Sequence, residues 1–300
     1  MFERGKSRKL RGVEILVVVS LCLFLLAIIG PVSKRCRAFA WRTKCGNNLS
    51  VIGKGTLAYA NDHDGELPRS GGGNTVLAPS IPDWLATDRS GAYGLQPDGS
   101  RGQGSISSCF YLLVKYQAVT PGRFVCPADA GTTEFNPDDE AAGDRELVHL
   151  WDFGPFGGKH CSYSYHVPFG LYALTTSNEP GMAVAADRSP WRASPDVPVK
   201  ELRLSDRHGD RETEKAWNSI THQENGQNVL FLDGHVAFER NPFCGVNNDN
   251  IYTFWDGGDI RRGGLPNLSS RPQSRTDSLL VHDHPRPPHN PPPPMRDGDL

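Results

Sequence analysis

The hydrophobic pattern of the first sixty residues predicts one long helix with two different halves. Residues 15–32 read ILVVVSLCLFLLAIIGPV, an uncharged run of eighteen residues, which is at the lower limit of length for crossing a bilayer. No pattern of small residues typical of signal-peptide cleavage follows the run, since basic residues come next. The sequence therefore predicts a transmembrane helix over residues 13–32, preceded by a basic, leader-like segment over residues 1–12.

After this run the pattern becomes amphipathic. Side chains that suit a buried face recur at spacings of three and four residues, at Ala38, Trp41, Cys45, Leu49, Ile52, Thr56 and Tyr59. This spacing places them on one stripe of a helix. It predicts an amphipathic continuation over residues 33–60 that packs on its own domain. Gly46, Gly53 and Gly55 lower the helix propensity and predict breaks in the last turns.

The pattern of residues 61–280 predicts an α+β domain with large loop insertions. Tyr163, Tyr165 and Val167 alternate with polar residues, which is typical of a half-buried strand. Residues 181–190 predict a short buried strand that ends at Asp187, and residues 108–119 predict a helix over the sheet. The 32 glycines and 24 prolines favour many turns.

Two segments are expected to lie outside the sheet. Residues 70–104 are rich in Gly, Pro, Ser and Asp and predict a long surface loop. Residues 281–300 are rich in proline and histidine and predict a disordered tail, because such a composition cannot form a packed core.

A hairpin is predicted within the stretch THQENGQNVLFLDGHVAF. Asp233 and Gly234 separate two β-rich runs, residues 229–232 and 235–238. An Asp-Gly pair in this position favours a two-residue type I′ turn. His222 is expected to close a loop against the hairpin.

The same stretch has an alternative interpretation as a metal site. His222, Asp233 and His235, with Asp187 or Asp249, would offer nitrogen and oxygen ligands that suit zinc or another transition ion. No short fixed spacing such as H-E-x-x-H is present. We therefore predict a structural hairpin with no metal and no cofactor.

Cysteine spacing and overall charge exclude several other classes. Seven cysteines include no CxxC pair, so a zinc ribbon or finger is not indicated. Cys109 and Cys126 flank an apolar segment and are the disulfide pair that we predict. A net charge of −2 does not indicate nucleic-acid binding. The G-x-S-x-G, phosphate-loop and GxGxxG motifs are absent, which favours a protein that is not an enzyme.

Several blocks together resemble a known family. The stretch RGVEILVVV followed by KRCRAFAWRTKCGNNLSVIGKGTLAYANDHDGELP resembles the N-terminus of bacterial type IV prepilin-like proteins, especially the pseudopilins of type II secretion. SYSYHVPFG, AADRSP, PFCGVNNDNIYT and the His222, Asp233, Gly234, His235 block resemble segments of prepilin-like proteins with large ectodomains. The resemblance implies a pilin-like fold, in which the long helix packs on an antiparallel sheet.

The resemblance also implies roles for three residues near the N-terminus. A prepilin peptidase would cut after Gly12, Val13 would become the methylated N-terminus, and Glu14 would meet the terminal amine of a neighbouring subunit. The sequence departs from the family pattern here, because Glu14 would be the second residue after the cut, whereas family members have a glutamate at the fifth.

The combined prediction is a structural, non-catalytic prepilin-like or pseudopilin-like membrane protein. It would be a subunit or accessory of a type II secretion or type IV pilus-like filament, single-pass in the inner membrane with its C-terminal domain extracytoplasmic. Its expected partners are membrane lipid, prepilin peptidase and other pilin-like subunits. Nucleic acid is not an expected partner. Two alternatives are a membrane-anchored binding module for a glycan or surface polymer and a metal-dependent surface enzyme.

Overall fold

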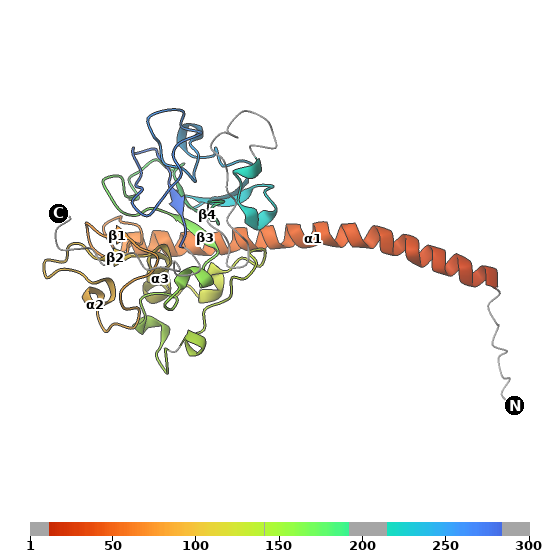
Figure 1. The fold of residues 1–300 in the computed structure, drawn as a ribbon, viewed down its shortest axis with the longest axis horizontal. Helices are drawn as coiled ribbons and strands as arrows, with labels where there is room; N and C mark the ends of the chain where they lie inside the picture. The colour runs from red at the N-terminus through yellow and green to blue at the C-terminus, as the bar shows by residue number, and fades with distance from the viewer. Residues whose placement is uncertain (1–11, 141, 192–214, 284–300) are drawn as a thin grey trace. The chain divides into compact units, whose positions relative to one another are not determined.

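The fold is taken from a computed structural model, which describes residues 12–140, 142–191 and 215–283 (Figure 1). The chain divides into two compact units, Met1–Trp41 and Arg42–Leu300. The α1 helix, Gly12–Asn61, contributes to both units. Most of the tail predicted for residues 281–300 lies outside the described residues.

The membrane-spanning part of the fold prediction is wrong. Among the residues that the structure describes, no helix combines the length and the apolar character that a membrane crossing requires. The apolar run is at the lower length limit and is interrupted by Ser20, Gly30 and Pro31. The predicted transmembrane half over residues 13–32 and the predicted single-pass location in the inner membrane are both corrected by this finding.

The amphipathic stripe of α1 is buried along its second half. Cys45, Leu49 and Ile52 are fully buried and Tyr59 is 3% exposed, whereas Trp41 is 37% exposed. The helix continues to Asn61 without the predicted breaks. Gly53 has a packing reason, because a Cβ at this position would lie 2.6 Å from Leu230 Cδ1. The glycine therefore lets α1 approach the sheet closely.

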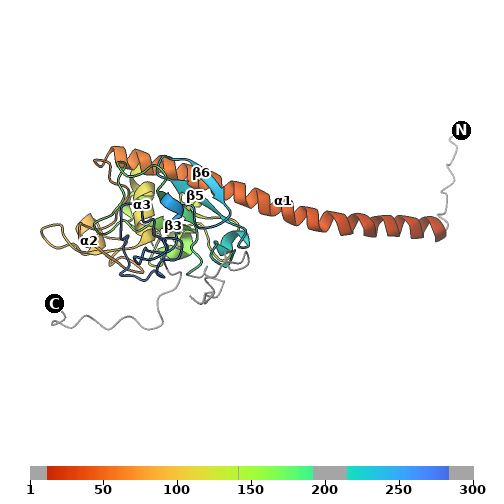
Figure 2. The same ribbon diagram turned by 90° about the horizontal axis from the view of Figure 1, so that it is seen from above.

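The large unit contains a five-stranded antiparallel sheet, which confirms that part of the α+β prediction. Its strands are β3 (Tyr163–His166), β4 (Ala183–Asp187), β5 (Gln227–Phe231), β6 (Val236–Glu239) and β7 (Leu280–Val281). Their order is β6-β5-β4-β3-β7, and all neighbouring strands are antiparallel. Figure 2 shows β5 and β6 beside the second half of α1. The sheet includes Val281, so the start of the predicted tail at this residue is wrong.

The strand predicted from Tyr163 to Val167 is present as β3, but both faces of the central strands are buried, so its predicted half-buried character is wrong. All residues of β3, β4 and β5 are buried. Tyr163 and Leu230 join the core formed with α1 and the next long helix, α3. Ala186 and Val229 belong to a second core with Tyr252, which comes from the chain between β6 and β7. This segment between β6 and β7 covers the second face of the sheet. The alternation of residues within a strand could not predict that contact.

The remaining elements surround this sheet. The α3 helix, Ile106–Gln117, is part of the main core. Asp283 fixes its N-terminus from far along the sequence, because the carboxylate accepts hydrogen bonds from the backbone N–H groups of Ile106 (3.0 Å) and Ser107 (2.6 Å). The predicted loop over residues 70–104 contains the α2 helix (Arg89–Tyr93) and the parallel strands β1 (Val76–Leu77) and β2 (Gln103–Gly104). Short 3-10 helices are η1 (Pro121–Phe124), η2 (Pro137–Glu140), η3 (Leu147–His149), η4 (Gly157–His160), η6 (Ile220–His222) and η7 (Val246–Asn248).

Candidate functional site

The predicted hairpin is present, and its turn is longer than expected. Strands β5 and β6 pair from Gln227 with Glu239 to Leu230 with Val236. The backbone N–H of Gly234 donates to Phe231 O (2.9 Å), and that of Phe231 donates to His235 O (3.0 Å). Gly234 has a φ of +87°, but Asp233 has no positive φ. The type I′ turn is therefore wrong, because that turn needs a positive φ at both central residues.

Asp233 and His235 form an exposed pair at the tip of this turn. His235 Nδ1 lies 2.5 Å from Asp233 Oδ1, with exposed side-chain fractions of 54% and 46%. The backbone N–H of His235 also donates to the same carboxylate (3.0 Å), which holds the pKa of Asp233 below its usual range. The ring of His235 stacks on Phe231 with the centroids 4.5 Å apart. These contacts give both residues a structural role in the hairpin.

His222 lies in a different environment, because it is buried beside the inner part of the hairpin. It belongs to the short helix η6 and is 9% exposed. Its Nε2 lies 3.2 Å from Asp187 Oδ2, 3.3 Å from Asn228 Nδ2 and 4.0 Å from Cys126 Sγ. One ring nitrogen therefore faces a carboxylate, an amide and a sulfur at once.

Asp187 is the centre of this buried group. It ends β4, as the sequence predicts, and is fully buried. Its Oδ2 accepts hydrogen bonds from Asn228 N (2.6 Å) and Asn228 Nδ2 (3.0 Å). Its Oδ1 has no hydrogen-bond partner among the described residues. A buried carboxylate oxygen without a donor is costly, so this atom calls for an explanation.

The disulfide of the structure joins Cys45 of α1 to Cys126, which follows η1. The predicted pairing of Cys126 with Cys109 is therefore wrong. Cys109 is a free, buried thiol whose sulfur lies 3.1 Å from Ser70 Oγ, and burial raises its pKa to about 12. Spacing along the chain could not identify the pair, because Cys45 is brought to Cys126 only when α1 packs on the domain.

The cysteine pair completes a compact cluster. A single ligand atom from each of Cys45, Cys126, Asp187 and His222 lies within 4.8 Å of every other, and all four residues are buried. Among the described residues this is the one group of histidine, cysteine and acidic side chains close enough to hold a metal ion. Asp233 and His235, which the sequence grouped with His222, do not belong to it. We call these four residues the Cys45 cluster.

Asp249, the other carboxylate considered with His222, lies in a separate buried site. Its Oδ2 accepts a hydrogen bond from Ser278 N (2.7 Å). Burial raises its pKa to about 8, and the nearby Asp277 adds to the shift. The folded protein therefore favours the neutral form of this side chain near neutral pH.

This shift predicts a pH-dependent loss of stability. A carboxyl whose pKa is raised on folding contributes stability that is fully present below its usual pKa and is lost as the pH rises through the folded value, here about 8. Asp249→Asn should keep the acceptor for Ser278 and remove this dependence. Chemical denaturation between about pH 5 and about pH 9 should show a flatter profile for the variant than for the wild type. Equal slopes in the two proteins would contradict the assignment.

The N-terminal part of α1 carries the predicted processing and assembly residues. Gly12 is the first residue of the helix, Val13 follows it, and Glu14 lies in the first turn. An acidic side chain in the first turn stabilises a helix through its interaction with the helix dipole. Large apolar side chains after Glu14 are exposed: Ile15 50%, Leu16 68%, Val17 55%, Val18 55%, Val19 51%, Leu21 60%, Leu23 62%, Phe24 65% and Leu25 47%. We call this set the apolar helix segment.

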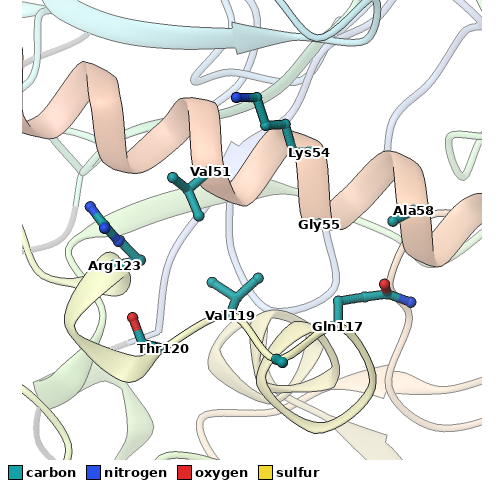
Figure 3. Close-up of a pocket in the computed structure, with 9 residues that line it drawn as sticks. Val51, Lys54, Gly55, Ala58, Gln117, Val119, Thr120 and Arg123 are labelled. Carbon is teal, nitrogen blue, oxygen red and sulfur yellow. The ribbon is translucent and has the colours of Figure 1, made fainter.

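A groove lies between the second half of α1 and the chain that follows α3 (Figure 3). It has a volume of about 410 Å³. Its lining residues are Val51, Lys54, Gly55, Ala58, Gln117, Ala118, Val119, Thr120 and Arg123. None of these is acidic, histidine or cysteine.

Sequence reasoning found His222, Asp187 and Cys126 separately and missed that they meet Cys45. The signal available was burial: Cys45 lies on the amphipathic stripe of α1, and Asp187 ends a strand predicted to be buried. Both observations place a polar or reactive side chain in the interior, but neither tells which partner it meets there.

Comparison with protein-family models, with curated proteins and with solved structures finds no match to this chain. The prepilin-like family therefore stays a prediction from the sequence blocks. The function of the chain is accordingly inferred from its own geometry.

Proposed function

We propose that this protein is a structural, non-catalytic subunit of a prepilin-like filament. In this proposal, the apolar helix segment packs against the equivalent segments of further copies of the same chain. The exposure of this segment carries the proposal, since Leu16, Leu23 and Phe24 are each more than 60% exposed. An apolar surface of this kind marks an interaction site.

The distribution of these side chains favours several neighbours over one. Positions 15 to 19 are apolar and exposed without interruption, so they surround the helix on all sides. A helix that is apolar all round is stable only when it is buried all round. A single partner helix would cover one stripe, whereas an open assembly of many copies covers every side.

The burial of the Asp187 and His222 pair supports a structural role. The Asp187 and His222 pair is buried against a disulfide, so no substrate reaches it in this state. In this proposal, Glu14, in the first turn of α1, meets the terminal amine of a neighbouring copy, which is the role that the prepilin resemblance implies.

Charge within the apolar helix segment should abolish assembly. Leu16→Lys combined with Leu23→Lys places two ammonium groups where neighbouring helices would meet, and burying unpaired charges is strongly unfavourable. Analytical ultracentrifugation of the full chain should show large assemblies for the wild type and at least about a ten-fold smaller assembled fraction for the variant, since about 1.4 kcal/mol already corresponds to that ratio.

Two controls make this test specific. Val76→Lys combined with Leu171→Lys also adds two charges at exposed apolar positions, 50% and 87% exposed, but outside the helix segment, and should assemble like the wild type. Cys22 is a free, exposed cysteine within the segment. Mild oxidation should therefore link copies of the wild type through a disulfide at Cys22 and should not link copies of the Cys22→Ser variant. A wild type that stays monomeric and unlinked at all concentrations would overturn the proposal.

A further inference from the structure

The geometry of the Cys45 cluster points to a function that neither the hairpin nor the filament explains. We propose that Cys45, Cys126, Asp187 and His222 form a redox-gated zinc site, which is closed by the disulfide when oxidised and binds one Zn²⁺ when the two cysteines are reduced. This inference is independent of the proposed filament role.

The set of ligands suits zinc. Zinc is bound by thiolate, imidazole and carboxylate groups, usually four of them in a tetrahedron. At ordinary zinc–ligand distances the ligand atoms of such a tetrahedron are about 3.3 to 3.8 Å apart. The four ligand atoms of the cluster already lie within 4.8 Å of one another. Release of the S–S bond lets the two sulfurs separate to the distance that the tetrahedron needs.

Two buried atoms indicate that the site is shaped for a cation. Asp187 Oδ1 has no hydrogen-bond partner among the described residues, although the side chain is fully buried. His222 Nε2 points toward Asp187 and Cys126, where a metal would accept its lone pair. A zinc ion in the cluster would place a positive charge beside the Asp187 carboxylate, whose Oδ2 faces His222 and whose Oδ1 has no hydrogen-bond partner among the described residues.

The second layer of contacts holds the ligands in place. Asn228 donates to Asp187 Oδ2 through its backbone N–H and its side chain, so the carboxylate cannot rotate freely. Such outer contacts orient metal ligands and raise affinity. The ligands come from four separate parts of the chain, namely α1, the segment after η1, the end of β4 and η6. All four positions are filled by the protein, which is typical of a structural zinc site and not of a catalytic one.

The chemistry balances without an unspecified component. A thiol reductant passes two electrons and two protons to the Cys45–Cys126 disulfide and becomes a disulfide itself. Zinc then displaces one proton from each thiol and forms two zinc–sulfur bonds. Cys45 and Cys126 therefore link α1 to the sheet domain in both states, through a covalent bond when oxidised and through the metal when reduced.

The two buried free cysteines do not offer an equivalent site. Cys109 and Cys161 are buried, and burial raises the pKa of each thiol to about 12. Neither belongs to a group of potential ligands among the described residues. They are therefore suitable positions for control variants.

The test is metal binding by the full chain in its two redox states. The chain is reduced with a dithiol, freed of reductant without air, and titrated with Co²⁺ and then with Zn²⁺. The reduced protein should bind one equivalent of Co²⁺ with a thiolate charge-transfer band and intense tetrahedral bands, and Zn²⁺ should remove both signals. The oxidised protein should show neither signal.

Variants distinguish this site from other ligands on the chain. Asp187→Asn and His222→Gln should each weaken Zn²⁺ binding by about 100-fold. This is the upper end of the loss of metal affinity that follows when a residue hydrogen-bonded to a metal ligand is replaced. Cys109→Ser and the double variant Asp233→Asn, His235→Gln should bind like the wild type. Binding by tail histidines would lack the thiolate band and would survive Cys45→Ser combined with Cys126→Ser.

A second measurement covers variants that fold poorly. In the wild-type chain, Zn²⁺ should protect Cys45 and Cys126 from alkylation after reduction and should raise the thermal midpoint of the reduced protein only. The proposal is overturned if the reduced wild type binds no stoichiometric Co²⁺, or if Zn²⁺ leaves both cysteines as reactive as before. Neither result bears on filament assembly, which is measured on the oxidised chain.

Discussion

Replacing both Cys45 and Cys126 with serine is expected to lower the free energy of unfolding by about 4 kcal/mol. The disulfide joins residues 81 positions apart, and closing a loop of this length removes much of the conformational entropy of the unfolded chain. The bond also ties α1 to the domain beside Asp187 and His222. Serine also leaves polar groups at two fully buried positions. The free energy of unfolding should therefore fall by at least the amount expected from loop entropy alone.

Chemical denaturation of the oxidised wild type and the variant measures this change. In a thermal scan the midpoint should fall by about 10 °C, given the usual relation between stability and midpoint for a domain of this size. Cys22→Ser combined with Cys36→Ser is the matched control, since both cysteines are free and exposed, and it should unfold like the wild type. A serine pair at 45 and 126 with unchanged stability would show that the bond does not hold α1 to the domain.

The second large effect is expected at Asp129. The guanidinium of Arg188 is fully buried, and its Nη2 and Nε lie 2.9 Å and 3.1 Å from Asp129 Oδ2. Asp129 is the acidic partner of this buried cation among the described ion pairs. Asp129→Ala would leave the positive charge without compensation, and losing one partner of a buried pair costs about 3 to 5 kcal/mol. Equilibrium denaturation of the variant measures the loss.

An exposed ion pair provides the control for this prediction. Arg261 Nε lies 3.4 Å from Asp259 Oδ1, with side chains that are 60% and 37% exposed. Asp259→Ala should change stability by less than about 1 kcal/mol, because water screens such pairs. If both alanine variants lose the same stability, burial of Arg188 is not the cause of the loss at Asp129.

The parts of the fold that depend on neighbouring residues could be predicted from the sequence. The stripe from Cys45 to Tyr59 is buried as its spacing indicates, because a helix repeats its faces every three to four residues. The β5 and β6 hairpin pairs as its two β-rich runs suggest, and β4 ends at Asp187 ahead of a proline. Each of these follows from the conformational limits of a short stretch of chain.

Other predictions failed where distant segments decide the outcome. Gly53 and Gly55 predict breaks in the last turns of α1, but the helix is continuous to Asn61, and Leu230 packs where a Cβ at Gly53 would lie. Strand β3 was expected to expose one face, but Ile251 and Tyr252 lie in the core that covers the second face of the sheet. The turn at Gly234 differs from the expected type because Phe231 and His235 extend the pairing around it.

In the candidate site, too, the sequence predicted residue types but not the contacts between distant residues. Its residue types were visible, since His222 and Asp187 were both considered as metal ligands from the sequence. The grouping of His222 with Asp233 and His235 relied on closeness along the chain, yet the latter two meet each other at the exposed tip of the turn. The site instead joins residues that are far apart in sequence.

By itself, the sequence determined the local conformations of this protein: an amphipathic helix, a buried strand that ends at Asp187, and a hairpin around Asp233 and Gly234. These depend on backbone geometry and on the repeat of apolar positions, which act over a few residues. Only the tertiary structure decided that Cys45 bonds to Cys126 and that His222 faces Asp187. The physical reason is that such pairs form when the packing of α1 against the sheet brings distant backbones within bonding distance.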